Sequence, residues 1–326
     1  MARDEFAPVE FPAHAALSEE VVRAVGDAPA GRDDGGGRGG RGGQRLLSVP
    51  GGTAPATAPL ARVGSRIGGA FEGRDGAAFI PFLSSGFPRP ADTPRLLERL
   101  AADGADIIEL GIPFSDPLAD GPTIQAASWR ALEQGVTVES TLDQLAGISA
   151  DLPPVVVFSY LNPILRMGVE RFLARAEVAG AAGLLVTDLP VGSHPALERR
   201  LAAGSLDLIP LAAPTTPRAR LETILGHASG FLYYISRLGV TGARKALDDS
   251  LEEQVRALRK MVRLPVAVGF GISTPEQAAA VAGMADGVVV GSALIAALGR
   301  GETAFAELSA ALAAAVHEND SWRKAE

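Results

Sequence analysis

Residues 78–110 read AFIPFLSSGFPRPADTPRLLERLAADGADIIEL. An apolar run over 78–83 is followed by a loop with glycine and proline, a segment of helical periodicity over 93–103, and a second apolar run over 106–110. Continuous apolar strands are typical of a sheet buried on both faces, and strands that alternate with helices pair in parallel through right-handed crossovers. The stretch therefore predicts one strand–helix–strand unit of a parallel α/β protein.

The same unit recurs along the chain. Eight apolar runs that read as strands cover residues 78–83, 106–110, 155–159, 184–187, 208–212, 231–235, 266–269 and 288–290. Segments that read as helices cover residues 93–103, 123–133, 170–179, 195–203, 217–225, 251–261 and 275–282. Eight such units in about 250 residues predict a (β/α)₈ TIM barrel. A doubly wound sheet is the alternative, but it would need a glycine-rich turn after the first strand, where residues 84–88 read SSGFP.

Composition divides the chain into three parts. Residues 1–64 are rich in Gly, Arg, Pro and Ala. Such a segment buries too little apolar surface to offset its chain entropy, so we expect a disordered N-terminal extension. Residues 65–316 carry the predicted TIM-barrel catalytic domain, and residues 317–326 form a short polar tail.

The extension allows other interpretations. Arg38, Arg41 and Arg45 are spaced as in an RGG-type RNA contact segment, but neighbouring acidic residues make the match weak. Early acidic residues also argue against a secretory signal or an organelle transit peptide. We favour a plainer interpretation, in which the segment is dispensable or translation starts downstream, near Val63.

The overall composition narrows the class of partner. The chain has 326 residues and a formal net charge of −8, which disfavours an extended contact with nucleic acid. It has no cysteine, which excludes disulfides and thiolate zinc sites, and its four histidines lack metal-ligand spacing. No apolar run approaches the ~20 residues of a membrane-spanning helix. We expect a cytoplasmic protein without a metal site, whose partners are proteins and small metabolites.

Two carboxylates stand where a barrel enzyme assembles its active site. Glu109 lies at the carboxyl end of the second predicted strand, where burial would raise its pKa toward that of a general acid or base. Asp120 lies near the end of the following loop, just before the helix predicted over 123–133. The pair could address opposite sides of one substrate. The alternatives are a strand-end salt bridge for Glu109, and a helix cap or Asx turn for Asp120 or Asp116.

Glycine-rich junctions follow the last three predicted strands. They are Gly239-Val-Thr-Gly242, Gly269-Phe-Gly-Ile-Ser273 and Gly291-Ser292-Ala293. Glycine allows a close approach to the backbone, and the N–H groups at a helix N-terminus attract a phosphate dianion. TIM barrels frequently bind phosphate after strands seven and eight. The junctions therefore predict a phosphate site, with ordinary loop glycines as the alternative.

These motifs resemble those of the tryptophan synthase alpha chain family. The similar segments, in order along the barrel, are FIPFLSSG (79–86), ELGIPFSDPLADGPTIQ (109–125), YLNPI (160–164), TDLP (187–190), YYISRLGVTG (233–242), VGFGIS (268–273) and VVVGSAL (288–294). The resemblance implies a TIM-barrel lyase that cleaves indole-3-glycerol phosphate to indole and glyceraldehyde 3-phosphate in L-tryptophan biosynthesis. It also implies that no cofactor is needed, and that a beta chain receives the indole through a tunnel in an alpha2beta2 heterotetramer.

The resemblance further implies roles for individual residues. It implies that Glu109 and Asp120 are catalytic and that Tyr233 and Phe82 contact the substrate. The implied phosphate contacts are Gly242, Gly271, Gly291 and Ser292, the implied closing loop includes Arg237 and Thr241, and the implied beta-chain contacts are Asp116, Asn162 and Asp188. One departure is Phe87, which stands where many members have aspartate. It bears on a loop hydrogen bond and not on the catalytic pair.

Three other functions remain as alternatives. A stand-alone indole-3-glycerol-phosphate lyase that releases free indole would share the barrel and the carboxylate pair. A non-catalytic activator of a beta chain is disfavoured, because both carboxylates are present. A phosphosugar isomerase would share the phosphate site but would have no reason to keep the segment over 109–125.

Overall fold

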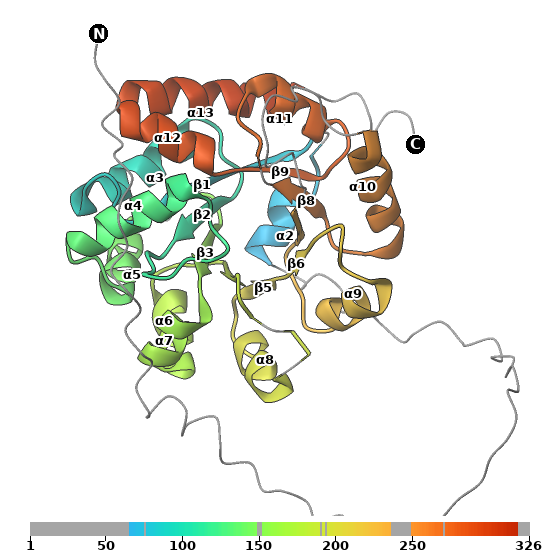
Figure 1. Ribbon diagram of the computed structural model, residues 1–326, viewed down its shortest axis with the longest axis horizontal. Coiled ribbons are helices and arrows are strands. Elements are labelled where there is room, and N and C mark those ends of the chain that lie inside the picture. The colour runs from blue at the N-terminus through green and yellow to red at the C-terminus, as the bar shows by residue number, and fades with distance from the viewer. Residues whose placement is uncertain are drawn as a thin grey trace, which may run out of the picture. The chain divides into compact units, whose positions relative to one another are not determined.

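A computed structural model describes residues 65–74, 76–148, 152–189, 191–192, 194–235, 249–269 and 271–318. Within these residues, parallel strands form a ring with helices packed around its outside (Figure 1). The strands are β1 (Ala78–Ser84), β2 (Ile108–Gly111), β3 (Val155–Ser159), β4 (Gly183–Val186), β5 (Asp207–Ile209), β6 (Leu211–Ala212), β7 (Leu232–Ile235), β8 (Val266–Gly269) and β9 (Gly287–Val290). Their order in the sheet is β5-β4-β3-β2-β1-β9-β8-β7-β6.

The ring closes at a proline. The two ends of the sheet, β5 and β6, are separated in the chain only by Pro210. Proline has no backbone N–H, so the strand predicted as continuous over 208–212 is interrupted there. Its carbonyl still accepts the Tyr233 N–H at 2.9 Å, which joins this strand to β7. β5 and β6 are thus two halves of the fifth strand, and the predicted (β/α)₈ barrel is confirmed.

The helices follow the predicted pattern in part. The predicted helices correspond to α3 (Thr93–Ala102), α4 (Pro122–Glu133), α7 (Val169–Val178), α8 (Pro195–Ala202), α9 (Arg218–Leu225), α10 (Asp249–Met261) and α11 (Pro275–Ala282). The structure adds α2 (Arg66–Phe71), a 3₁₀ turn η1 (Pro90–Asp92), α5 (Val138–Ala146), α6 (Leu161–Met167), α12 (Ser292–Arg300) and α13 (Glu302–His317). α5 begins with a capping box in which Thr137 and Ser140 bond each other's backbone N–H groups. Serine replaces the usual Glu or Gln of that motif, so the sequence signal was weak.

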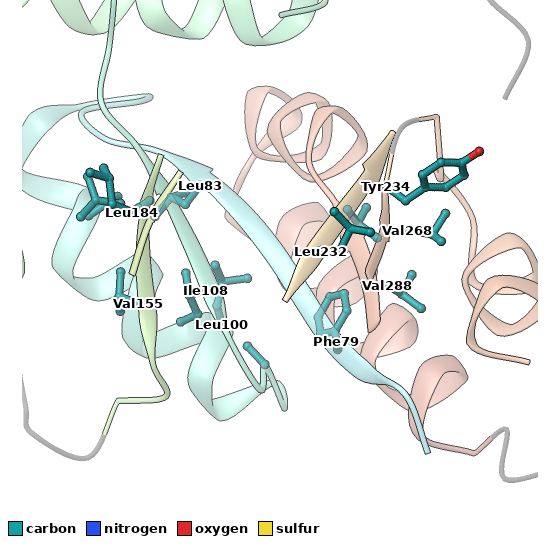
Figure 2. Packing of buried hydrophobic residues seen from close by; sticks show 14 of the residues in the cluster. Phe79, Leu83, Leu100, Ile108, Val155, Leu184, Leu232, Tyr234, Val268 and Val288 are labelled. Atoms are coloured by element: carbon teal, nitrogen blue, oxygen red, sulfur yellow. The ribbon is translucent and has the colours of Figure 1, made fainter. Parts of the chain in front are cut away.

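Side chains of the strands form two apolar layers, because successive residues of a strand point to opposite faces. The outer layer packs against the helices and includes Phe79, Ile108 and Leu232 (Figure 2). The inner layer fills the barrel and takes at least one residue from most strands: Ala78, Ile80, Val156, Leu185, Ile209, Tyr233, Ala267 and Val289. Ile108 faces outward, so Glu109, its neighbour on β2, faces into the barrel.

Helix α2 closes the amino-terminal end of the barrel. Ile67 is fully buried in the inner layer, and a β-carbon at Gly183, the first residue of β4, would lie 2.6 Å from its side chain. Phe71 packs against Phe231, just before β7, with ring centroids 5.7 Å apart. Ser65 caps the helix by accepting the Gly68 N–H at 3.0 Å. The barrel core therefore includes residues that precede the first strand.

We predict that Ile67→Ala lowers the free energy of unfolding by about 2–5 kcal/mol, because it opens a cavity in this closed end. Urea unfolding followed by circular dichroism would measure the loss. Val178→Ala is the matched control, since Val178 is 86% exposed and its truncation should change stability by no more than about 0.5 kcal/mol. Equal losses in both variants would contradict a closing role for α2.

Candidate active site

Glu109 is a carboxyl group buried inside the barrel. It is 1% exposed and stands opposite Phe82 in the register of β2 and β1. Its Oε1 atom is buried, with no hydrogen-bond partner among the described residues. Burial raises the pKa of Glu109 to about 8. A cationic neighbour would have lowered that pKa, so the alternative of a strand-end salt bridge is not supported.

Asp120 approaches the same region from the loop between β2 and α4, residues 112–121. The Asp120 N–H donates to the Pro117 carbonyl at 3.0 Å, and the Asp120 carbonyl accepts from Gln125 Nε2 at 2.9 Å. Burial raises the pKa of Asp120 to about 6, while a hydrogen bond from the Tyr160 hydroxyl acts to lower it. Gly121 is the N-cap of α4, so Asp120 is not the helix cap that was one of the alternatives for it. Tyr160 carried no predicted role.

Tyr233 is a buried tyrosine on which both carboxyl groups act electrostatically. It is 8% exposed, and its pKa lies well above the usual range because of burial first, and then the negative charges of Glu109 and Asp120. Its ring lies against the backbone of Gly269 on β8, where a β-carbon would be 2.8 Å from the tyrosine Cζ. The structure therefore places Tyr233 within electrostatic reach of the two carboxyl groups, and its contact with a substrate stays a prediction.

We predict that Gly269→Ala lowers stability by about 1–3 kcal/mol, because the new methyl group overlaps the Tyr233 ring and forces it to move. Thermal or urea unfolding would measure this, and the fluorescence of the tyrosines would report the displacement. Gly69→Ala on α2 is the matched control. A β-carbon there meets nothing within 4 Å, so this variant should be neutral or up to ~1 kcal/mol more stable. If neither Gly269→Ala nor Gly69→Ala changed the stability, the Tyr233 ring would have room for a methyl group at position 269.

Phe82 forms an apolar wall beside Glu109. Its ring packs edge-on against Phe158, with centroids 5.3 Å apart and an interplanar angle of 76°. Phe87, the departure noted in the sequence, packs against the same cluster, together with Ile124. The Phe87 side chain thus makes apolar contacts at this position. Such a wall suits the flat face of an aromatic substrate.

Two of the predicted phosphate contacts lie at the start of α12. Gly291 is the N-cap of this helix and Ser292 is its first residue, so their N–H groups lie at the positive end of the helix dipole. Gly291 is also adjacent to Phe82, because a β-carbon there would lie 3.4 Å from the Phe82 Cβ. Gly271, after β8, has a positive φ of 79°, which glycine adopts without strain. The helix N-terminus and Glu109 therefore flank the same phenylalanine.

The remaining predicted site residues lie elsewhere or outside the described residues. Arg237, Thr241 and Gly242 belong to the segment over 236–248, which the structure does not describe. Asp116, Asn162 and Asp188 are exposed, and Asp188 accepts the Leu161 N–H at 2.7 Å, which places it beside the start of α6.

Two kinds of feature are absent from the part of the chain that the structure describes. Its residues contain no group of three or more His, Cys, Asp or Glu side chains arranged as a metal site. None of the described helices is both long enough and apolar enough to cross a membrane.

The fold and the site together define a class of protein. The chain is a TIM-barrel enzyme with two carboxyl groups of raised pKa at one end of the barrel and a helix N-terminus nearby. Those features suit acid–base chemistry on a phosphorylated substrate.

Comparison with known proteins identifies the family. The family model of the tryptophan synthase alpha chain matches residues 70–322. The alpha chain of Gloeobacter violaceus is 48% identical over 233 residues, which is 71% of this chain and 84% of that relative. A structure of Mycobacterium tuberculosis tryptophan synthase has a TM-score of 0.72 at 38% identity, covering 78% of this chain and 98% of that one. The Legionella pneumophila alpha chain has a TM-score of 0.71 at 34% identity, covering 79% and 99%. The chain belongs to the tryptophan synthase alpha chain family.

Proposed function

We propose that Glu109 and Asp120 act as an acid–base pair in the cleavage of indole-3-glycerol phosphate to indole and glyceraldehyde 3-phosphate. This cleavage is the reaction of the alpha subunit of tryptophan synthase in L-tryptophan biosynthesis, and the chain is a carbon–carbon lyase of that family. One observation carries the assignment of roles. Near neutral pH, a pKa of about 8 keeps Glu109 protonated, and a pKa of about 6 keeps Asp120 ionised.

Glu109 supplies the proton that makes indole a leaving group. The bond from indole C3 to the glycerol side chain breaks readily only after C3 is protonated, because the ring then carries a positive charge that accepts the bonding electrons. The protonated Glu109 carboxyl group delivers that proton. The resulting carboxylate takes the proton of the adjacent side-chain hydroxyl group as the aldehyde forms, which restores its starting state.

Asp120 acts on the other side of the ring. Its carboxylate accepts a hydrogen bond from the indole N1–H and stabilises the positive charge that forms when C3 is protonated. It holds the N1 proton while the ring is cationic, and the ring regains its aromaticity as the C–C bond breaks. A positioned acid or base contributes roughly 10²–10⁴ in rate. These two roles require that Glu109 is protonated and Asp120 is ionised at neutral pH.

The other predicted residues hold the substrate in this proposal. The N–H groups around Gly271, Gly291 and Ser292 bind the phosphate, together with Gly242, and fix the scissile bond between the two carboxyl groups. Arg237 and Thr241 belong to a loop that closes over the substrate and excludes water. Tyr233 and Phe82 line the pocket for the indole ring.

The proposal predicts a bell-shaped pH dependence of kcat/KM. Activity should be highest between about pH 6 and about pH 8, where Asp120 is ionised and Glu109 is protonated. It should fall about tenfold per pH unit below this range as Asp120 gains a proton, and equally above it as Glu109 loses one. Initial rates of indole release in a constant-ionic-strength buffer series would measure both limbs. A rate that stays level up to pH 10 would show that no protonated Glu109 is needed.

A beta-chain partner is the second part of the proposal. Asp116, Asn162 and Asp188 form the contact surface. Two exposed apolar side chains near them support a protein interface: Leu118 is 85% exposed and Leu165 is 47% exposed. In this proposal two such pairs assemble as an alpha2beta2 heterotetramer in the cytoplasm.

The test is indole release from indole-3-glycerol phosphate by the purified chain, with and without a tryptophan synthase beta chain. Slow release that the beta chain accelerates strongly is expected for an alpha subunit. Fast release that the beta chain leaves unchanged would favour the stand-alone lyase. Absence of release, with stimulation of the beta chain, would favour the non-catalytic activator.

A further inference from the structure

The Tyr160 hydroxyl group lies where three separate segments meet. Tyr160 follows β3 and is 4% exposed, and its ring packs on Phe114 with centroids 4.9 Å apart and an interplanar angle of 30°. Its hydroxyl oxygen accepts the Ala119 N–H at 3.0 Å. It also has hydrogen-bond contact with the Asp120 carboxyl group and with the Thr187 hydroxyl on the turn after β4.

The donor and acceptor capacities of these groups fix the direction of the bonds. A tyrosine hydroxyl has one proton to donate and two lone pairs to accept with. The Ala119 N–H can only donate, so it takes one lone pair. An ionised carboxylate can only accept, so the hydroxyl proton points to Asp120. The Thr187 hydroxyl donates its own proton to the Ser159 carbonyl at 3.4 Å, so its contact with Tyr160 fixes no further bond. The Tyr160 hydroxyl proton is thus directed to Asp120 while that carboxylate is ionised.

We propose that Tyr160 is a positioning residue whose hydroxyl group clamps the end of the loop over 112–121 to β3 and β4, and so holds the Asp120 carboxylate in place at the active site. The inference rests on the proposed role of Asp120, which it deepens. Phe114 and Ala119 belong to the same loop, so Tyr160 contacts that loop at two points. Its ring packs on Phe114, and its hydroxyl oxygen accepts the Ala119 N–H. Asp120 follows Ala119 directly.

The clamp also favours the ionised form of Asp120. Among the described residues, the titratable groups that interact with Asp120 are Tyr160 after β3 and Tyr233 on β7, and Glu109 on β2 acts on the same Tyr233. Tyr160 donates a hydrogen bond to the carboxylate and stabilises its charge. Tyr160→Phe keeps the ring and its stacking on Phe114 but removes the hydroxyl group. Asp120 should then bind its proton more tightly, and the Ala119 N–H should lose its acceptor.

The decisive experiment follows the titration of Asp120 by carbon NMR, in protein labelled at the aspartate carboxyl carbons. The Asp120 signal is assigned by its loss in Asp120→Asn. In Tyr160→Phe its midpoint should move up by about one pH unit. The acid limb of kcat/KM should move by the same amount. Tyr234→Phe is the matched control, because the Tyr234 hydroxyl donates to Gln254 at 2.7 Å, outside the barrel interior, and should shift neither. An unchanged midpoint in Tyr160→Phe would overturn the proposal.

Two features keep this test independent of other failures. The NMR titration needs no activity, so a chain that fails to release indole would remove the proposed function and leave this result readable. Amide hydrogen exchange in the unaltered protein covers the case in which Tyr160→Phe does not fold. The Ala119 amide should exchange on the order of tenfold more slowly than expected for an open loop. An unprotected Ala119 amide would refute the clamp directly.

Discussion

Replacing Glu109 with glutamine is expected to lower kcat for indole release by about 10²–10⁴-fold while the barrel stays folded. Glutamine has nearly the shape of glutamate, but its amide cannot deliver a proton to indole C3. Glu109 is 1% exposed and its Oε1 has no described hydrogen-bond partner, so the change removes no described hydrogen bond of that oxygen. Urea unfolding should therefore show equal or slightly higher stability.

Glu98→Gln is the matched control for this variant. Glu98 lies on α3 and is exposed, so the same chemical change there should leave kcat and stability unaltered. Single-turnover assays of indole formation would separate the chemical step from product release. If Glu109→Gln retained full kcat, Glu109 could not be the general acid. The source of the C3 proton would then have to be another group.

Asp120→Asn is expected to produce a second large loss, again about 10²–10⁴-fold in kcat. Asparagine can still accept a hydrogen bond through its carbonyl oxygen, but it carries no charge to stabilise the protonated indole ring. Because the substrate's ground state is uncharged at the ring, the loss should be mainly in kcat and less in KM. Steady-state kinetics over a range of indole-3-glycerol phosphate concentrations would distinguish the two.

The control here is Asp143→Asn on α5, an exposed aspartate whose side chain pairs only with Arg175 among the described residues. A surface pair of this kind contributes roughly 0–1 kcal/mol, so its loss should be small and without effect on kcat. Should Asp120→Asn raise KM with kcat unchanged, Asp120 would be a binding group and the electrostatic role would be wrong.

Much of the fold follows from hydrophobic patterning. Residues 155–159 and 266–269 were predicted as strands and are β3 and β8, and residues 275–282 were predicted as a helix and are α11. Each of these segments begins at or directly after a proline, which marks its start clearly. The alternation of side chains along the strand over 106–110 also places Glu109 on the face opposite to Ile108.

Other features depend on contacts that no local pattern carries. α2 is six residues long, too short to show a helical period, and its burial depends on strands far along the chain. Proline lacks a backbone N–H, which favours a break in the strand at Pro210, but the surrounding apolar residues favour one continuous strand. Tyr160 contacts Ala119, 41 residues earlier. The role of Tyr160 depends on the position of the loop over 112–121, and the local sequence around β3 does not determine that position.

The buried carboxyl group of Glu109 has a consequence for anyone who engineers this chain. A polar group inside an apolar barrel, with one oxygen unpartnered, is unfavourable for folding, so leucine or methionine at position 109 would remove that penalty. Selection of a variant library for thermostability alone would enrich such substitutions, and the selected variants would lack catalytic activity. Thermostable forms should therefore be selected with position 109 held fixed, or by growth without external tryptophan.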